Sequence, residues 1–406
     1  MSTLRLNPLV DALKPSATLA MTQRARTLKA EGVPIVSLSA GEPDFDTPAP
    51  IVEAAARAMR DGWTHYTDNA GLPDLREAIA DKLRRENGLT GVTGKQVVVS
   101  NGAKQSIAQV ILALTRPGDE VICLAPYWVS YPEMIQLAGG RAVVVEASAA
   151  DAYKVSPEAL DAAITERTRL VLLNSPSNPT GAVYTRAEME AIADVLRRHE
   201  HVHILSDEIY EYVVYGAEHV SIGSFPGLEE RTITVNGFSK GYAMTGWRLG
   251  YLAAAPAIAA ACDTVQSQFT SAPSTISQKA GIAALAMGRA PIDRMVAAFR
   301  DRRDRFAGRL AALPGVTLPV PDGAFYVFPD VRGLYGRSVG GRLVESADEF
   351  CFLLLERYHV AGVPGAAFGG PDGLRFSYAA SQDDLDTAAD RIERCVADLM
   401  ASEPAG

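Results

Sequence analysis

TVNGFSKGYAMTGWRLG, residues 234–250, places Lys240 among small and hydroxylated residues directly after a run of β-branched residues. Arg248 closes the same segment. Asp207, in HILSDEIY, and Asn178, in NSPSNPTG, likewise come just after apolar runs that are typical of strands. In open α/β sheets, ligands bind outside the carboxyl ends of the strands. We therefore predict that these four polar side chains share one pocket.

Seven short apolar or β-branched runs alternate with amphipathic segments along the chain. Such alternation is typical of a mostly parallel sheet that helices cover on both faces. The expected strands span residues 96–100, 120–125, 142–147, 169–174, 201–206, 232–236 and 249–255. The pattern leaves open whether one of these strands runs antiparallel.

Further motifs extend over nearly the whole chain. They are KPSAT (14–18), AGEPDFDTP (40–48), HYTDNAGLPDLREAIA (65–80), NGAKQ (101–105), PYWVSYPEM (126–134), DGAFYVF (322–328) and RFSYA (375–379). Together with GFSK, DEIY and NPTG, in this order and spacing, they resemble the fold-type-I pyridoxal-phosphate enzymes. The resemblance is strongest to the class I aminotransferases, in particular the bacterial aspartate and aspartate-prephenate subgroup.

That resemblance implies an α/β fold with two domains. A large domain, residues 49–289, would hold a seven-stranded, mostly parallel sheet between helices. Residues 1–48 and 290–406 would form a smaller α+β domain with an N-terminal arm. The sequence changes character near residue 290, where a long charged helix is expected over 294–313. A smaller domain of this kind can close over the larger one.

The resemblance also implies pyridoxal 5'-phosphate as the cofactor. Lys240 would hold the cofactor aldehyde as a Schiff base, and then serve as the base that moves the substrate proton. Asp207 would pair with the pyridine nitrogen and keep it protonated. Asn178 and Tyr210 would hydrogen-bond the phenolic oxygen. NPTG also has the composition of a turn, and both interpretations of Asn178 can hold together.

The phosphate would lie at the start of a helix that NGAKQ opens. Backbone amides at a helix N-terminus face outward and bind anions. The residues expected around the phosphate are Gly102, Ala103, Lys104, Ser239 and Arg248. Tyr66 resembles a tyrosine that reaches the phosphate from a neighbouring subunit. We therefore expect a homodimer with active sites at its interface.

Substrate recognition is expected from residues spread along the chain. Arg375 can take the substrate α-carboxylate through two parallel hydrogen bonds. Trp128 would stack on the cofactor ring, although ordinary core packing is its alternative role. Asn178 would also contact the substrate. Gly41 would bring its backbone near the carboxylate, although a plain turn explains this glycine equally well.

Lys104, Lys14 and Thr18 indicate a dicarboxylic amino acid, aspartate or glutamate, with a 2-oxo acid such as 2-oxoglutarate or oxaloacetate as the partner. Prephenate is a further possible acceptor. Two alternatives stay open. One is an aromatic or other aminotransferase, because one methylene in a pocket changes selectivity between substrates by only ~1 to 3 kcal/mol. The other is a pyridoxal-phosphate lyase of the same fold.

Composition limits the remaining classes of function. The 406 residues carry a formal net charge of −9, which argues against a nucleic-acid surface. No run of eighteen apolar residues occurs, so we expect no membrane span. Four scattered cysteines without a C-x-x-C pair predict reduced thiols and a cytoplasmic location. HEHVH (199–203) lacks a fourth ligand nearby, so we expect no metal site.

Overall fold

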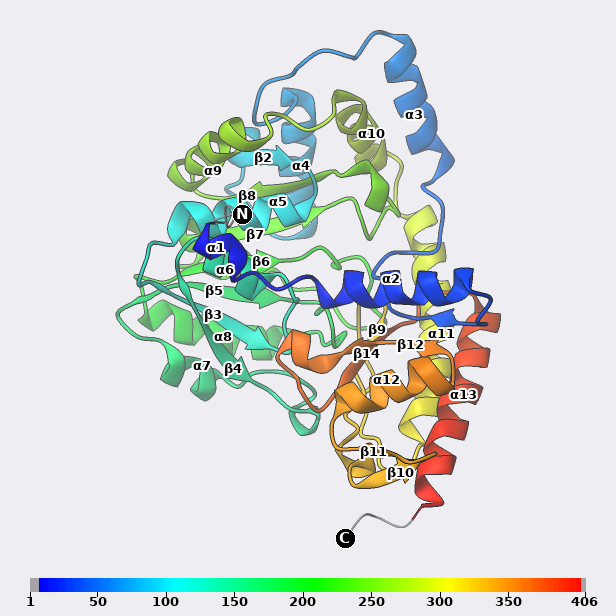
Figure 1. Cartoon of the computed structure of the whole chain (residues 1–406). Coiled ribbons are helices and arrows are strands. Elements are labelled where there is room, and N and C mark those ends of the chain that lie inside the picture. Colours follow the sequence, from blue (N-terminus) through cyan, green and yellow to red (C-terminus); the bar gives the residue numbers. More distant parts are fainter. Residues whose placement is uncertain (1–6, 403–406) are drawn as a thin grey trace, which may run out of the picture.

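The computed structural model describes residues 7–402. Its largest sheet has seven strands in the order β2-β8-β7-β6-β5-β3-β4 (Figure 1). The strands are β2 (Val97–Ser100), β3 (Glu120–Ala125), β4 (Arg141–Glu146), β5 (Thr168–Asn174), β6 (His203–Asp207), β7 (Thr232–Gly237) and β8 (Gly250–Ala253). Each matches a predicted strand to within a few residues. β8 runs antiparallel to both of its neighbours, β2 and β7. The other neighbouring strands of this sheet are parallel.

Both faces of this sheet are buried along its central strands, as the continuous apolar runs predicted, whereas the edge strand β4 is partly exposed. In β3, Val121 and Cys123 belong to one hydrophobic core, whereas Ile122 belongs to the core on the opposite face. This alternation follows from the period of two along a strand. One face is covered by α5 (Ala103–Leu114), α6 (Tyr131–Leu137) and α9 (Pro256–Phe269). The other is covered by α7 (Pro157–Ala163) and α8 (Arg186–Arg198).

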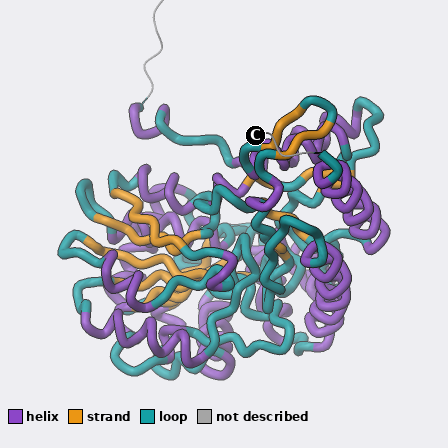
Figure 2. The backbone as a smooth tube through the Cα atoms, turned by 90° about the horizontal axis from the view of Figure 1, so that it is seen from below, coloured by secondary structure: helices purple, strands orange, loops and turns teal. Residues whose placement is uncertain are grey.

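A third core lies at the β2 and β8 end of the sheet. Side chains of β2 and β8 pack there against α3 (Ala49–Arg60), α4 (Pro73–Glu86) and α10 (Thr275–Ala286). Figure 2 shows the strands of the large sheet lying together among the helices.

Another core joins the two ends of the chain. Among the described residues the first helix is α1 (Pro8–Asp11). This core packs α2 (Ala17–Ala30) against α11 (Ala290–Ala311), α12 (Ala347–Arg357) and α13 (Gln382–Met400). A small antiparallel sheet is built from β9 (Tyr326–Val327), β13 (Val363–Pro364) and β14 (Leu374–Ser377). β1 (Val36–Ser37) pairs with β12 (Val360–Ala361), and β10 (Arg337–Val339) with β11 (Arg342–Val344).

α11 begins four residues before the helix that the sequence predicted. Pro291 lies in its first turn, where the missing N–H costs no hydrogen bond. The predicted smaller domain also includes residues 1–6 and 403–406, which lie outside the described residues.

The strand directions explain why polar residues gather at one edge of the large sheet. β2, β3, β5, β6 and β7 all end at that edge, and β8 begins there. Asn174 at the end of β5 is paired with Asp207 at the end of β6. Gly237 at the end of β7 faces Gly250 at the start of β8. Residues far apart in the sequence are therefore neighbours at this edge.

Candidate active site

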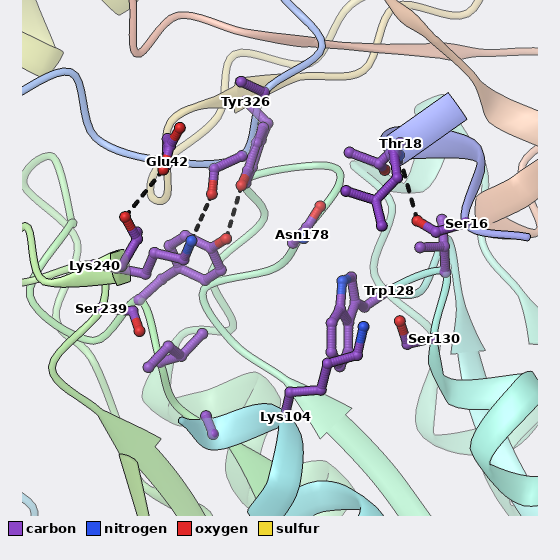
Figure 3. Close-up of a pocket in the computed structure, with 18 of the residues that line it drawn as sticks. Ser16, Thr18, Glu42, Lys104, Trp128, Ser130, Asn178, Ser239, Lys240 and Tyr326 are labelled. Carbon is purple, nitrogen blue, oxygen red and sulfur yellow. Dashed lines mark hydrogen bonds between the residues drawn. The ribbon is translucent and has the colours of Figure 1, made fainter. Parts of the chain in front are cut away.

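A pocket of about 430 Å³ opens at the carboxyl edge of the large sheet (Figure 3). Its walls come from both ends of the chain as well as from the sheet edge. Twelve of the predicted site residues line it: Thr18, Gly41, Ala103, Lys104, Trp128, Asn178, Asp207, Tyr210, Ser239, Lys240, Arg248 and Arg375. The four polar residues first expected to share a pocket therefore do so.

Lys240 follows the end of β7 and points into this pocket (Figure 3). Its ammonium nitrogen Nζ donates a hydrogen bond to the carbonyl oxygen of Gly41. Burial lowers the pKa of this amine to about 8, against the opposing effect of the Glu42 carboxylate. A lysine with such a pKa is partly uncharged near neutral pH, so its nitrogen can act as a nucleophile or base.

Asp207 ends β6 and is almost fully buried. Tyr131 donates its hydroxyl hydrogen to Asp207 Oδ2 at 2.8 Å, and the Ile209 amide donates to Oδ1 at 3.3 Å. Burial raises the pKa of this carboxyl to about 6, although the Tyr131 hydrogen bond lowers it. A buried carboxylate without a matching cation is unfavourable, so this position suits a positively charged ligand group.

Arg375, in β14, is a buried cation with no carboxylate partner among residues 7–402. Its Nη1 donates to Asn178 Oδ1 at 3.0 Å, and its Nη2 donates to the Ser39 carbonyl oxygen at 2.7 Å. Its Nε is buried without a hydrogen-bond partner. Burial lowers the pKa of this guanidinium. Such a group fits a small carboxylate that enters the pocket.

The N-terminus of α5 forms an anion cradle beside these residues. No side chain caps this helix within the described part of the chain. Gly102 precedes it with φ of 83°, and a Cβ atom there would lie 2.5 Å from Arg248 Nη2. A Cβ at Gly250 would lie 2.3 Å from the Ala103 nitrogen. Both glycines therefore allow Arg248 and the free amides to converge.

Lys104 and Trp128 form another wall of the pocket (Figure 3). The Lys104 ammonium lies 5.1 Å from the centre of the Trp128 ring. Burial lowers the pKa of this lysine, and the positive charge of Arg248 lowers it further. The described chain shows no carboxylate paired with Lys104, so its ammonium can meet an anionic ligand.

Three predicted site residues do not line the pocket of this single chain. Gly102 lies just behind it, against Arg248. Lys14 is exposed, and its backbone amide donates to Glu133 Oε2 at 2.9 Å. Tyr66 is 95% exposed and lies in a separate surface hollow with Trp63 and Thr275.

The sequence did not reveal several residues that complete the site. Glu42 lines the pocket and accepts a hydrogen bond from Thr245. Asn174 accepts from the Asn178 amide at 2.8 Å and donates to the Asp207 carbonyl at 2.8 Å. Tyr326 shares a hydrogen bond of 2.8 Å with Tyr210. The sequence could have indicated Asn174, because it is a polar residue at the end of an apolar strand, as Asp207 is.

The histidines of HEHVH do not form a cluster of metal ligands. His199 pairs with Asp161 at 2.7 Å, and His201 bonds the carbonyl oxygen of Thr165 at 3.0 Å. Elsewhere in the described residues, Glu208, Glu211 and His219 lie close enough together to hold an ion. The Lys82 ammonium already contacts Glu211 there and supplies a positive charge.

Comparison with known proteins decides the family. The chain matches the family described as aminotransferase class I and II over residues 33–392. The chain belongs to this family. It is therefore an aminotransferase of the fold-type-I class, and its cofactor is pyridoxal 5'-phosphate. The resemblance seen in the sequence motifs is confirmed.

Relatives of this aminotransferase match it over nearly its full length. A bifunctional aspartate aminotransferase and glutamate/aspartate-prephenate aminotransferase of Petunia hybrida is 49% identical, over 98% of this chain and 84% of the relative. An aspartate/prephenate aminotransferase of Cereibacter sphaeroides is 47% identical, over 97% of this chain and 99% of that relative. The crystal structure of the Rhizobium meliloti aspartate aminotransferase matches with a TM-score of 0.94 and 42% identity, over 98% of this chain and 100% of that one.

The Thermus thermophilus aspartate aminotransferase, solved with maleate, gives a TM-score of 0.91 at 43% identity, over 97% of this chain and 100% of that one. These similarities confirm the predicted α/β fold. No helix in residues 7–402 combines the length and apolar character needed to cross a bilayer. All four cysteines are free and buried, as the sequence predicted.

Proposed function

We propose that this aminotransferase moves the amino group between aspartate or glutamate and a 2-oxo acid in two half-reactions that share the pocket. The observation that carries this proposal is that Arg375 and Lys104 both line its walls and that neither has a carboxylate partner among residues 7–402. Arg375 lies beside Asn178, whereas Lys104 lies beside Trp128. A substrate with two carboxylates can pair with both. The aspartate and prephenate specificities of the relatives, and maleate in the Thermus structure, support this choice.

The pocket residues fit pyridoxal phosphate. The cofactor supplies an aldehyde that takes up the amino group and a ring that withdraws electrons. Lys240 Nζ would bind the aldehyde and later move the proton of the substrate α-carbon. Asp207 would hold a proton on the pyridine nitrogen, since a cation there balances its buried charge. Asn178 Nδ2 and the Tyr210 hydroxyl would donate to the phenolic oxygen.

The anion cradle fits the phosphate group. We assign its binding to the amides of Ala103 and Lys104 at the start of α5, together with Ser239 and Arg248. The uncapped helix end and the glycine at 102 support this assignment. Trp128 would then cover the ring. Thr18 and Gly41 line the part of the pocket that the substrate would occupy.

We also infer a homodimer. Tyr66 is 95% exposed although it is aromatic, and Trp63 and Phe269 are also exposed on the described chain. Trp63 and Tyr66 line the same surface hollow, and neighbouring exposed aromatic side chains of this kind are typical of an interface. In the dimer, Tyr66 of one subunit would reach the phosphate of the other, and Lys14 would lie near the substrate entrance.

We further propose the domain division and the location that the sequence suggested. Residues 49–289 would form the large domain, and the two chain ends would form the smaller one. The separate core of α2, α11, α12 and α13 supports this division. The four buried free cysteines support a reducing compartment such as the cytoplasm.

The substrate proposal is tested with purified enzyme and a panel of amino donors, using 2-oxoglutarate and prephenate as acceptors. We expect kcat/KM for aspartate and glutamate to exceed that for phenylalanine. Equal values for aspartate and phenylalanine would contradict the dicarboxylate proposal. Formation of a 2-oxo acid without any acceptor would instead indicate lyase chemistry.

Lys104→Met is expected to lower kcat/KM for aspartate by about 10- to 100-fold, because the distal carboxylate loses a charge-assisted hydrogen bond. The value for phenylalanine should fall much less. Lys29→Met, an exposed change on α2, is the control. An equal loss for both donors would mean that Lys104 serves the cofactor and not substrate selection.

Tyr131→Phe is expected to weaken cofactor binding by about 10-fold or more near pH 6, because Asp207 loses a hydrogen bond to its charged form. Loss of this bond raises the pKa of Asp207, so the pH midpoint of cofactor affinity should move upward. Titration of the apoenzyme with pyridoxal phosphate at several pH values measures the midpoint. An unchanged midpoint would show that the Tyr131 hydroxyl does not tune Asp207.

A further inference from the structure

A buried polar network lies behind the cofactor-facing residues and is not used by the proposed chemistry. It consists of Lys82 on α4, Asn87 at the end of α4, Glu208 and Glu211 after β6, and His219. Each of the five side chains is about nine-tenths buried or more. Two carboxylates are therefore held in the interior at some distance from solvent, where each needs several donors.

Asn87 connects the two carboxylates. Its Nδ2 donates to Glu208 Oε2 at 3.0 Å and to Glu211 Oε2 at 2.8 Å. Its Oδ1 accepts from Lys82 Nζ at 2.7 Å, and the same ammonium contacts Glu211. The single amide thus links three buried charges and holds the two like-charged carboxylates at a fixed spacing.

Glu208 has three further donors. Ser206 and Ser221 donate to its Oε1 at 2.8 and 2.7 Å, and His219 Nε2 bonds its Oε2 at 3.1 Å. Burial raises the pKa of Glu208, but these partners outweigh burial, and the net effect is a lowered pKa. The carboxylate is therefore ionised and firmly held.

Residues of this network are adjacent in sequence to residues that line the pocket. Asp207 and Tyr210 line the pocket, whereas the residue after each of them, Glu208 and Glu211, lies in the network. The chain between residues 207 and 211 thus has one side toward the cofactor site and the other toward Asn87. A shift of either carboxylate must move the neighbouring side chain in the pocket.

We propose that Asn87 is a positioning residue for the cofactor, which it serves by fixing Glu208 and Glu211 so that Asp207 and Tyr210 face the pocket. This role rests on the proposed function of those two residues. Asn87 carries no charge, so its substitution tests geometry without adding or removing a charge beside Asp207. The amide is the member of the network that both carboxylates share.

The test compares Asn87→Ala with Glu120→Gln. Glu120 is another buried carboxylate, held by Arg141, Arg167 and Thr165, at the start of β3 and hence at the opposite edge of the sheet. The readouts are the melting temperature of the apoprotein and the Kd for pyridoxal phosphate, measured through tryptophan fluorescence well below melting. Turnover of aspartate is measured separately.

We expect Asn87→Ala to raise the cofactor Kd about tenfold and to lower kcat more than it changes KM. Glu120→Gln should lower the melting temperature while leaving the cofactor Kd unchanged. The same Kd for wild type and Asn87→Ala would overturn the proposal. If Asn87→Ala does not fold, Asn87→Ser, which also removes the amide donors to Glu208 and Glu211, serves in its place, and an unchanged cofactor Kd again overturns the proposal. Failure of the wild type to take up pyridoxal phosphate would reject the proposed function instead.

Discussion

Lys240→Ala is expected to abolish transamination, with a loss of kcat of about four orders of magnitude or more, because in the proposed chemistry one nitrogen serves as both the covalent anchor and the base. The variant should lack the covalent link to pyridoxal phosphate, so borohydride should trap no cofactor on the protein. Activity is measured with aspartate and 2-oxoglutarate. Mass spectrometry after borohydride treatment measures the link.

The control for this experiment is Lys29→Ala, which removes an exposed lysine on α2. It should keep wild-type turnover and borohydride trapping. The apoprotein of Lys240→Ala should remain folded, since within residues 7–402 the Lys240 side chain forms a single hydrogen bond, to Gly41. Normal turnover by a folded Lys240→Ala protein would reject the proposed chemistry entirely.

Asp207→Asn is expected to have opposite effects on stability and on cofactor binding. The pKa of Asp207 is about 6 in the folded apoprotein, above its ordinary value of 3.8. The native state therefore binds more protons than the unfolded state between these values, and the apoprotein loses stability as pH rises through this range. The decrease in the free energy of unfolding approaches ~3 kcal/mol at pH 7, because one pKa unit corresponds to about 1.4 kcal/mol.

Asparagine cannot ionise, so apo Asp207→Asn should be more stable than the wild-type apoprotein at pH 7, and the two should converge near pH 4. Its cofactor affinity and turnover should fall by about two orders of magnitude or more, because the pyridine nitrogen loses the anionic partner that we propose for it. Urea unfolding of the apoproteins and cofactor titration measure the two effects. Asp301→Asn, on the exposed side of α11, is the control. A destabilised apo variant at pH 7 would show that hydrogen bonds at Asp207 outweigh its burial.

Much of the large sheet could be predicted because its strands other than the edge strand β4 are largely buried on both faces. A strand such as Val97–Ser100 reads as an unbroken apolar run, and a polar residue then marks its end. The direction of β8 could not be predicted, because side-chain alternation is the same in parallel and antiparallel strands. The strands β9 and β13 have only two residues each, which is too short for a periodic signal.

The polar groups of the site were predictable where they follow a strand, and hidden where distant segments meet. Lys240, Asp207 and Asn178 belong to the first kind. Glu42 belongs to the second, since its effect on Lys240 depends on packing between residues almost two hundred positions apart. Tyr131 reads as an apolar helix residue, and only the structure shows its hydroxyl on Asp207.

Arg375 donates to the carbonyl oxygen of Ser39, and Ser377 donates its amide hydrogen to the carbonyl oxygen of Leu38. These contacts join an early and a late part of the polypeptide beside the pocket, whose walls include Gly41 and Arg375. During synthesis on the ribosome, the amino-terminal part must therefore wait for almost all of the remaining chain before the cavity can close. A nascent chain interrupted before β14 would lack Arg375, which we propose binds the substrate carboxylate, even with the large sheet already folded.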